Sequence, residues 1–332
     1  IKEFFNYVNK KNGKTNGEIK DLKKKIAGLE KGKIECENPE AELVACKEQL
    51  EAAQKKLFKP IIGCEVYVAP RSRFDKVHGL DSDRYHLILL CKNETGYQNL
   101  LKLVSSAWVD GFYTKPRVDR EILEKYSDGL IALSGCLFGE VAQKILSRNI
   151  DEAKETARWY KNTFGADNYY LEVQNHGMVE EKEVLDGIVT ISREFDIPMV
   201  ATNDVHFTRK EDGPAHDRLI CLSTGKDLDD PNRMLYSKQE WFKTREEMNQ
   251  VFADVPEALS NTIEVLDKVE TYSIDNAPIM PNFAIPEDFG TEEEYRQRIT
   301  EQELFDEFTR DEKGNVVLSE EDAHKKIKKL GG

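Results

Sequence analysis

From residue 58 onward the sequence alternates short apolar runs with segments of helical periodicity. The apolar runs cover residues 60–68, 85–91, 130–134, 169–174 and 198–202. The segments with helical periodicity cover residues 96–109, 138–147, 151–164 and 179–195, and residues 214–268 are mostly helical in pattern. Continuously apolar strands are buried on both faces, and strands separated by helices usually pair in parallel. The alternation therefore predicts an α/β fold with a parallel sheet, either open or closed into a barrel.

Charge and cysteine usage exclude several classes of protein. The net charge is −14, which argues against a stand-alone nucleic-acid coat but not against a local basic channel. No apolar run reaches the roughly 18–20 residues of a membrane span, so we expect a cytoplasmic protein. No CxxC spacing indicates a zinc finger or a disulfide framework. The thiols expected to be reduced are Cys36, Cys46, Cys64, Cys91, Cys136 and Cys221.

The first 57 residues have a different pattern. Residues 1–11 read as a helix that stops at the turn signal Asn12-Gly13, so residues 1–17 are predicted to form a barrel helix and a turn. Residues 18–57 are rich in Lys, Glu and Ala, with two apolar stripes separated by Asn38-Pro39, an N-cap followed by a first helical residue. This pattern predicts an inserted antiparallel helical hairpin, an appendage or docking arm rather than a catalytic element. Residues 58–270 form the main domain, and residues 271–332 are predicted to be a linker and a charged extension.

Polar residues beside the apolar runs are the first candidates for function, because functional groups gather where parallel strands end. Glu65 interrupts an apolar run, so it is either paired or metal-bound, or it faces solvent from an edge strand. His86 opens the next run and is either a metal ligand or a satisfied core histidine. Cys136 closes a third run, where a buried inert thiol is the alternative.

Asp204 and His206 are the strongest local signal. They follow an apolar run at positions i and i+2, which places both side chains on one face of an extended backbone. A carboxylate beside an imidazole suits zinc or manganese, and a hydrogen bond that closes a loop is the alternative. Together with Glu65, His86 and Cys136 they are five potential ligands at strand ends, which suggests a metal cluster that activates water in a phosphoesterase.

Two further groups are weaker candidates. Alternation would place Glu172, Gln174 and His176 on one face, either as part of the site, with His176 as a possible nucleic-acid or rim contact, or as a structural polar network. Lys115 and Arg117 follow two aromatic residues and could contact single-stranded nucleic acid, with a solvated loop as the alternative.

Several stretches together resemble the polymerase-and-histidinol-phosphatase (PHP) domain, and in particular the branch found in alpha subunits of bacterial DNA polymerase III. The similarity extends from Phe58 to about Asp306. The stretches that carry it are KPIIGCEVYVAP at 59–70, YHLIL at 85–89, GFYTKPR at 111–117, LSGC at 133–136, VATNDVH at 200–206, TGK at 224–226, DDPNRM at 229–234 and PEALSNT at 256–262.

The resemblance implies a distorted (β/α)7 barrel with a zinc or manganese cluster at one rim. By position it places Glu65, His86, Cys136, Asp204 and His206 on the family's metal ligands. Family members with an intact site resemble metal-dependent 3′–5′ exonucleases, whereas others stabilise the polymerase and bind the proofreading exonuclease subunit. The implied partners are DNA and the other replicase subunits, and the implied cofactor of the whole polymerase is Mg²⁺.

The sequence departs from the family pattern near its start. The His-x-His motif and the Asp-His motif of the family are absent from these 332 residues, which open on Ile1 inside an apparent helix. We therefore expect a piece of a longer polymerase subunit, with an incomplete barrel and an incomplete metal cluster. Such a piece would not polymerise DNA and would hydrolyse phosphoesters poorly. A docking module and a free-standing phosphatase of the histidinol-phosphate type are the alternatives.

Overall fold

The structure is a computed structural model that describes residues 2–34, 38–274, 291–310 and 316–330. The chain divides into two compact units, Ile1–Asp275 and Asn276–Gly332. Cys36 and most of the predicted linker lie outside the described residues. Within the described ranges, no helix has the length and apolar character needed to cross a bilayer.

A sheet forms the centre of the first unit. Among the described residues it has six strands, in the order β3-β1-β2-β4-β5-β6. The strands are β1 (Gly63–Val68), β2 (Tyr85–Cys91), β3 (Arg117–Val118), β4 (Leu130–Leu133), β5 (Tyr169–Val173) and β6 (Met199–Ala201). Five of them lie within the predicted apolar runs. The two-residue strand β3 was not predicted, because two residues are too few to show a periodic pattern.

The sheet is mixed, so the prediction of a parallel sheet was wrong. Strand β2 runs antiparallel to both of its neighbours, β1 and β4, whereas the other neighbouring pairs are parallel. A parallel neighbour needs a crossover that returns the chain to the same end of the sheet. Residues 69–84 contain neither helix nor strand, and the chain simply reverses. No pairing among the described strands joins β3 to β6, so closure into a (β/α)7 barrel stays a prediction.

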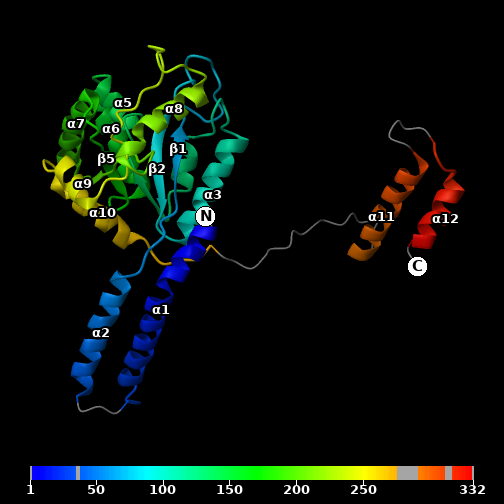
Figure 1. Cartoon of the computed structure of the whole chain (residues 1–332), viewed down its shortest axis with the longest axis horizontal. Coiled ribbons are helices and arrows are strands. Elements are labelled where there is room, and N and C mark those ends of the chain that lie inside the picture. The colour runs from blue at the N-terminus through cyan, green and yellow to red at the C-terminus, as the bar shows by residue number, and fades with distance from the viewer. Residues whose placement is uncertain (1, 35–37, 275–290, 311–315, 331–332) are drawn as a thin grey trace. The chain divides into compact units, whose positions relative to one another are not determined.

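Helices cover the sheet and connect its strands (Figure 1). Helix α3 (Glu94–Val109) follows β2, and the short α4 (Arg120–Lys125) precedes β4. Helices α5 (Glu140–Leu146) and α6 (Ile150–Phe164) lie between β4 and β5, and α7 (Val179–Phe195) connects β5 to β6. Their apolar faces form one contiguous core with the strands, in which Leu89, Leu103 and Leu171 are fully buried.

Two helix starts show how the local sequence determines an N-cap. Asn38 caps α2 (Pro39–Lys55), as predicted, and its side chain accepts a hydrogen bond from the Ala41 backbone N–H. Helix α3 begins at Glu94, two residues before the predicted segment 96–109. The cap is Asn93, whose Oδ1 accepts a hydrogen bond from the Gly96 backbone N–H at 3.1 Å.

Helix α1 (Lys2–Glu30) does not stop at Asn12-Gly13, contrary to the prediction. Asn12 is buried, and its side chain both donates to the Phe58 carbonyl at 2.8 Å and accepts from the Phe58 N–H at 3.0 Å. Although Asn12-Gly13 is locally typical of a turn, Asn12 lies within the helix and forms tertiary hydrogen bonds with Phe58. Beyond it, α1 and α2 lie side by side and extend away from the sheet (Figure 1). Their contact is built on Ile26, Leu29 and Cys46.

In the described part of the first unit, β6 is followed by the short 3₁₀ helix η1 (Lys210–Asp212) and three α-helices, α8 (Gly213–Thr224), α9 (Arg245–Val251) and α10 (Pro256–Lys268). The segment 225–244 between α8 and α9 contains no helix, although the sequence pattern predicted mostly helix there. Arg233 ties this segment to α8 through two hydrogen bonds to the Asp217 carboxylate, at 2.5 and 3.1 Å. A bidentate pair of this kind holds a loop in place without regular backbone pairing.

The second unit contains α11 (Glu292–Thr309) and α12 (Glu320–Leu330). The two helices contact each other, with the rings of Phe305 and His324 4.7 Å apart. Ala323 is fully buried, whereas Val316 and Val317 of the short apolar patch are exposed.

Candidate functional site

Glu65, His86 and Cys136 come together at one edge of the sheet. The Glu65 Oε1 atom lies 2.5 Å from the His86 Nδ1 atom, and the Cys136 Sγ atom lies 3.5 Å from the same nitrogen. Because β2 runs antiparallel to β1 and β4, its first residues lie at the edge where β4 ends. The register pairs Tyr67 with His86, so Glu65, two residues before Tyr67, is a diagonal neighbour of His86 on the same face. His86 therefore reaches the site from the beginning of its strand.

The surroundings of Glu65 and Cys136 shift the pKa values of these two residues. The hydrogen bond from His86 lowers the pKa of Glu65, against a smaller opposing effect of burial, and the charge of His206 adds to the lowering. Burial raises the pKa of the Cys136 thiol to about 12, and the carboxylate of Asp204 adds to this effect. At neutral pH the thiol is therefore protonated, and a metal ion would have to displace that proton in order to bind.

Asp204 and His206 lie in the loop after β6 and not on a continued strand. Asp204 has a φ of 41°, in the left-handed region, so the expected alternation of side chains does not apply. The His206 Nδ1 atom lies 2.7 Å from the Asp204 backbone carbonyl oxygen and 3.8 Å from its Oδ1 atom. The loop-closing hydrogen bond is thus the contact that the structure shows. With its proton on Nδ1, His206 presents Nε2 to the Tyr236 hydroxyl at 3.3 Å.

A buried polar network holds this loop. The backbone carbonyl oxygen of Asn203 lies 3.0 Å from the His176 Nε2 atom. The side-chain oxygen of Asn203 accepts a hydrogen bond from the Lys243 Nζ atom at 2.9 Å. The Asn203 amide donates to the Trp241 carbonyl at 2.7 Å, and the His206 N–H donates to the Glu240 carbonyl at 2.8 Å. Residues 239–243 therefore lie along residues 203–207 and restrain the backbone on which Asp204 and His206 stand.

The five predicted ligands are close enough to influence one another but are not arranged as a metal cage. Interactions between charges couple Glu65 with His206 and Cys136 with Asp204. Carboxylate, imidazole and thiol are donors that zinc accepts. Within the described ranges, however, no three His, Cys, Asp or Glu side chains are spaced so that they could hold one metal ion. The donor types fit a metal, and the spacing does not.

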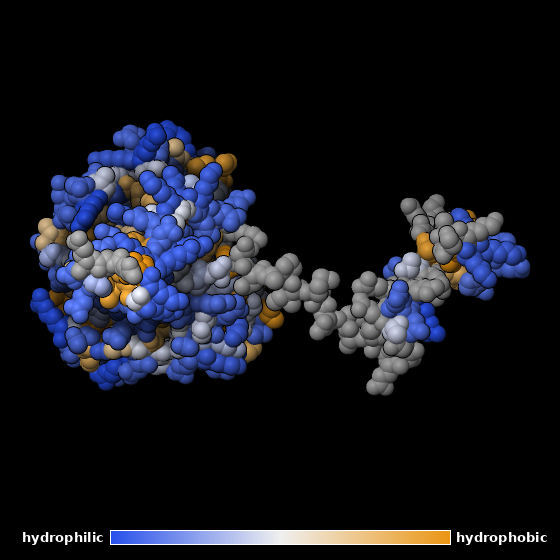
Figure 2. Space-filling view, turned by 90° about the horizontal axis from the view of Figure 1, so that it is seen from below, coloured by the Kyte–Doolittle hydropathy of each residue, from blue (hydrophilic) through white to orange (hydrophobic). Residues whose placement is uncertain are grey.

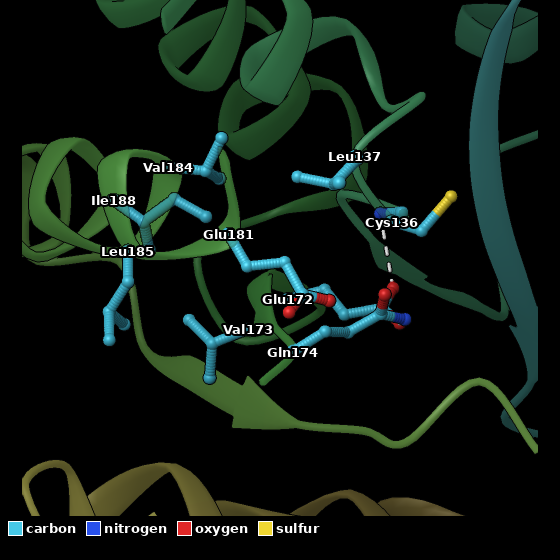
Figure 3. Close-up of a pocket in the computed structure, with 10 residues that line it drawn as sticks. Cys136, Leu137, Glu172, Val173, Gln174, Glu181, Val184, Leu185 and Ile188 are labelled. Carbon is cyan, nitrogen blue, oxygen red and sulfur yellow. Dashed lines mark hydrogen bonds between the residues drawn. The ribbon is translucent and has the colours of Figure 1, made fainter. Parts of the chain in front are cut away.

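Glu172 on β5 is a buried carboxyl that the sequence left undecided between the site and a structural network. It accepts hydrogen bonds from the Gly135 N–H at 3.1 Å and from the Thr202 hydroxyl at 2.5 Å (Figure 3 shows the first). It therefore joins the loop that carries Cys136 to the end of β6. Burial, the largest cause, raises the pKa of Glu172 to about 7. A carboxylate inside an apolar run was the signal that identified Glu65, and the same signal identifies Glu172.

The pocket beside Glu172 is lined on its other side by apolar residues of α7, including Val184, Leu185 and Ile188 (Figure 3). Its volume is about 10 Å³, which is room for one water molecule. The pocket is therefore part of the packing behind the site and not a substrate chamber.

The three weaker candidates differ in accessibility. Arg117 is 1% exposed and donates hydrogen bonds to the backbone carbonyls of Gly111, Asp81, Arg73 and Asp75. His176 is also buried, with Nδ1 2.5 Å from a carboxylate oxygen of Glu181. The interpretation of Arg117 and His176 as nucleic-acid or rim contacts is therefore corrected, because both side chains are buried and form hydrogen bonds within the protein. Lys115 is exposed, and its predicted role stays a prediction.

Tyr236 is a neighbour of the site that the sequence did not indicate. Its ring centroid lies 4.7 Å from that of His206 and 5.2 Å from that of His216. Burial raises the pKa of Tyr236, and the charges of Asp204 and Glu65 contribute to the same shift. An aromatic residue in an irregular segment thirty positions after His206 has no local pattern that could reveal this contact.

Comparison with known proteins agrees with this architecture. Residues 28–176 match the family model described as the PHP domain. Glu65, His86 and Cys136 lie inside the matched range, and Asp204 and His206 lie beyond it. The chain thus contains a domain of the PHP family.

More particularly, the chain is homologous to proteins named DNA polymerase III subunit alpha. It is 42% identical to that protein of Treponema pallidum (strain Nichols) over 265 residues, which are 79% of this chain and 22% of the relative. The protein of the same name from Borreliella burgdorferi is 43% identical over 251 residues, which are 75% of this chain and 22% of the relative. The one from Thermus aquaticus is 42% identical over 255 residues, which are 73% of this chain and 20% of the relative. The chain spans about a fifth of the length of these relatives.

Proposed function

We propose that this chain serves DNA replication in the cytoplasm as the PHP module of a DNA polymerase III alpha subunit. The whole protein would synthesise DNA on a template with Mg²⁺, and its partners would be DNA and the other replicase subunits. The proposal rests on the homology to alpha subunits. The close approach of Glu65, His86 and Cys136 at one edge of the sheet supports it. The three relatives named above are polymerase subunits, which disfavours a free-standing phosphatase of the histidinol-phosphate type.

Within this role we propose that Glu65, His86, Cys136, Asp204 and His206 are remnants or parts of a zinc or manganese site. PHP domains are generally metal-dependent. The side chains offer suitable donors, but the described residues contain no group of three at a spacing that holds a metal ion. Because this spacing among the described residues does not suit a metal ion, we expect these 332 residues to hydrolyse phosphodiesters poorly.

A nuclease assay tests this expectation. The protein is incubated with Mn²⁺ or Zn²⁺ and single-stranded DNA that carries a 3′ label, beside the variant Asp204→Asn. We expect both proteins to release nucleotides at the same background rate. Rapid release by the wild-type protein that is lost in the variant would show an active site and would overturn the proposal of weak hydrolysis.

A docking role is the second candidate, and the absence of a three-donor group in the described residues favours it over catalysis. In this role the module binds the proofreading exonuclease subunit or braces the polymerase. A pull-down with that purified subunit, with and without chelator, separates the two ideas. We expect binding that survives the chelator. Failure to bind in either condition would exclude this partner, and binding only with metal would assign the five residues to a structural metal site.

A further inference from the structure

The two helices of the hairpin differ sharply in charge. Residues 10–33 of α1 and the turn after it contain nine lysines and three acidic residues, although the whole chain has a net charge of −14. Helix α2 has the opposite character, with four glutamates and two lysines between Pro39 and Lys55. Two ion pairs cross between the helices, Lys25 with Glu42 and Lys47 with Glu30. The remaining lysines of α1 are in excess of what the packing of the hairpin uses.

The excess lysines lie on one side of α1. At 3.6 residues per turn, Lys10, Lys14, Lys20 and Lys24 fall within about a third of the helix circumference, opposite the buried residues Ile19 and Ile26. We call these four residues the lysine stripe. All four are exposed, and the described residues provide no ion-pair partner for any of them. Asp21 is the one acidic residue in the same sector of residues 10–24.

A shallow groove runs beside the stripe. Its volume is about 480 Å³, and it is lined by Lys20, Lys23 and Lys24 together with Asn16, Ile19 and Ala27. The aliphatic part of a lysine side chain can pack on the apolar residues of such a groove while its ammonium group stays in water at the edge. The stripe therefore presents several cations beside a concave surface. Figure 2, seen from below relative to Figure 1, shows a largely hydrophilic surface with small separate hydrophobic patches.

We propose that the lysine stripe of α1 binds the sugar-phosphate backbone of duplex DNA. From Lys10 to Lys24 the helix rises about 21 Å, which is a row of cations long enough to follow several successive phosphates of one strand. The acidic remainder of the chain repels phosphates, so a bound duplex is directed to the hairpin. The choice of DNA among polyanions rests on the proposed function in replication. The site is distinct from the strand-end residues Glu65, His86 and Cys136.

Binding of the full chain to a fluorescent 20-base-pair duplex tests the proposal, with anisotropy measured at several salt concentrations. The test variant is Lys14→Gln/Lys20→Gln/Lys24→Gln, because glutamine keeps the helix propensity of lysine and removes its charge. The matched control is Lys76→Gln/Lys125→Gln/Lys182→Gln, which changes the net charge equally at exposed positions outside the hairpin. Circular dichroism verifies that each variant keeps its helix content.

We expect the test variant to bind DNA at least about tenfold more weakly at low salt, because each phosphate contact adds to the affinity by releasing counterions. The slope of log K against log salt should fall by about 3 units in size. The control should stay within about twofold of the wild-type protein. Equal weakening of both variants, or no salt-dependent binding by the wild-type protein, would overturn the proposal. Competition by polyglutamate as strong as that by DNA would overturn it in favour of an acidic protein partner.

The result is independent of the hydrolysis proposal. The test variant keeps all five proposed metal ligands, and its nuclease background can be measured in the same samples. Loss of DNA binding with unchanged background would support the stripe alone, whereas a wild-type protein that cleaves DNA would contradict weak hydrolysis and leave the binding comparison intact.

Discussion

Individual side chains in this protein determine how neighbouring loops are held together. Glu172 is the clearest case, because its carboxyl joins the loop after β4 to the end of β6 from a buried position. A buried carboxyl is stable only if hydrogen bonds replace its lost hydration. The three donors around Glu172, on Gly135, Thr202 and Gln174, supply that replacement.

Glu172 should make the stability of the protein depend on pH. Its pKa in the folded protein is about 7, above the ordinary value of 4.5, so the folded state holds a proton that the unfolded state releases. The free energy of unfolding should therefore fall by about 3 kcal/mol as the pH rises from 4.5 to 7. Urea unfolding across this range should show a flatter dependence for Glu172→Gln than for the wild-type protein. The exposed Glu180→Gln is the control, and an equal pH dependence in all three proteins would contradict the assignment.

Arg117 should act on stability and not on nucleic-acid binding. Replacement by lysine keeps the charge but cannot reach four carbonyls, so Arg117→Lys should lower the free energy of unfolding by about 2–4 kcal/mol. The exposed Lys115→Ala should change it by less than about 0.5 kcal/mol. A stable Arg117→Lys variant with weakened DNA binding would restore the interpretation of Arg117 as a contact residue.

At the scale of secondary structure, the hairpin depends on a small number of contacts. Among the described residues, α1 and α2 share a small cluster beyond the point where α1 leaves the main core. Its buried members are Ile26, Leu29 and Cys46, with Ile34, Leu43 and Leu50 partly buried against them. A helix the length of α2 is marginal in water by itself. The pairing of the two helices therefore stabilises both of them.

Leu29→Ala should loosen the hairpin without unfolding the sheet. The substitution removes a buried side chain from a small cluster and should cost about 2–4 kcal/mol locally. Hydrogen exchange should become faster in α2, whereas amides of β4 and β5 keep their protection. Val44→Ala, at an exposed position of α2, should leave exchange unchanged. Faster exchange throughout the sheet in Leu29→Ala would show that the hairpin and the sheet unfold as one unit.

At the scale of the whole molecule, the two compact units differ in how much they bury. The first unit contains one large contiguous core, whereas in the described part of the second unit only Thr309 and Ala323 are buried. Helices gain most of their stability in proteins from packing. The second unit should therefore be much less stable than the first.

Hydrogen exchange measured by mass spectrometry tests this difference on the intact chain. Peptides from α11 and α12 should exchange far faster than peptides from β4 and β5, because their backbone hydrogen bonds open with little loss of buried surface. Low concentrations of urea should remove the protection of α11 and α12 first. Protection in α11 and α12 equal to that of the central strands would show a stability that the described packing does not explain.

The sequence by itself determined the positions of five strands and of the main helices, because the period of the apolar residues reports local backbone geometry and burial. It also singled out Glu65, His86 and Cys136, since polar residues beside apolar runs need partners. Their role as metal ligands stays a prediction, as do the domain boundaries.

Only the tertiary structure decided the direction of β2, the continuation of α1 through Asn12 and the burial of Arg117 and His176. These features depend on contacts between residues far apart in the chain, such as Asn12 with Phe58 or Arg117 with the carbonyl of Arg73. The free energy of such contacts outweighs a local turn signal or a local charge pattern, and no short stretch of sequence contains both partners.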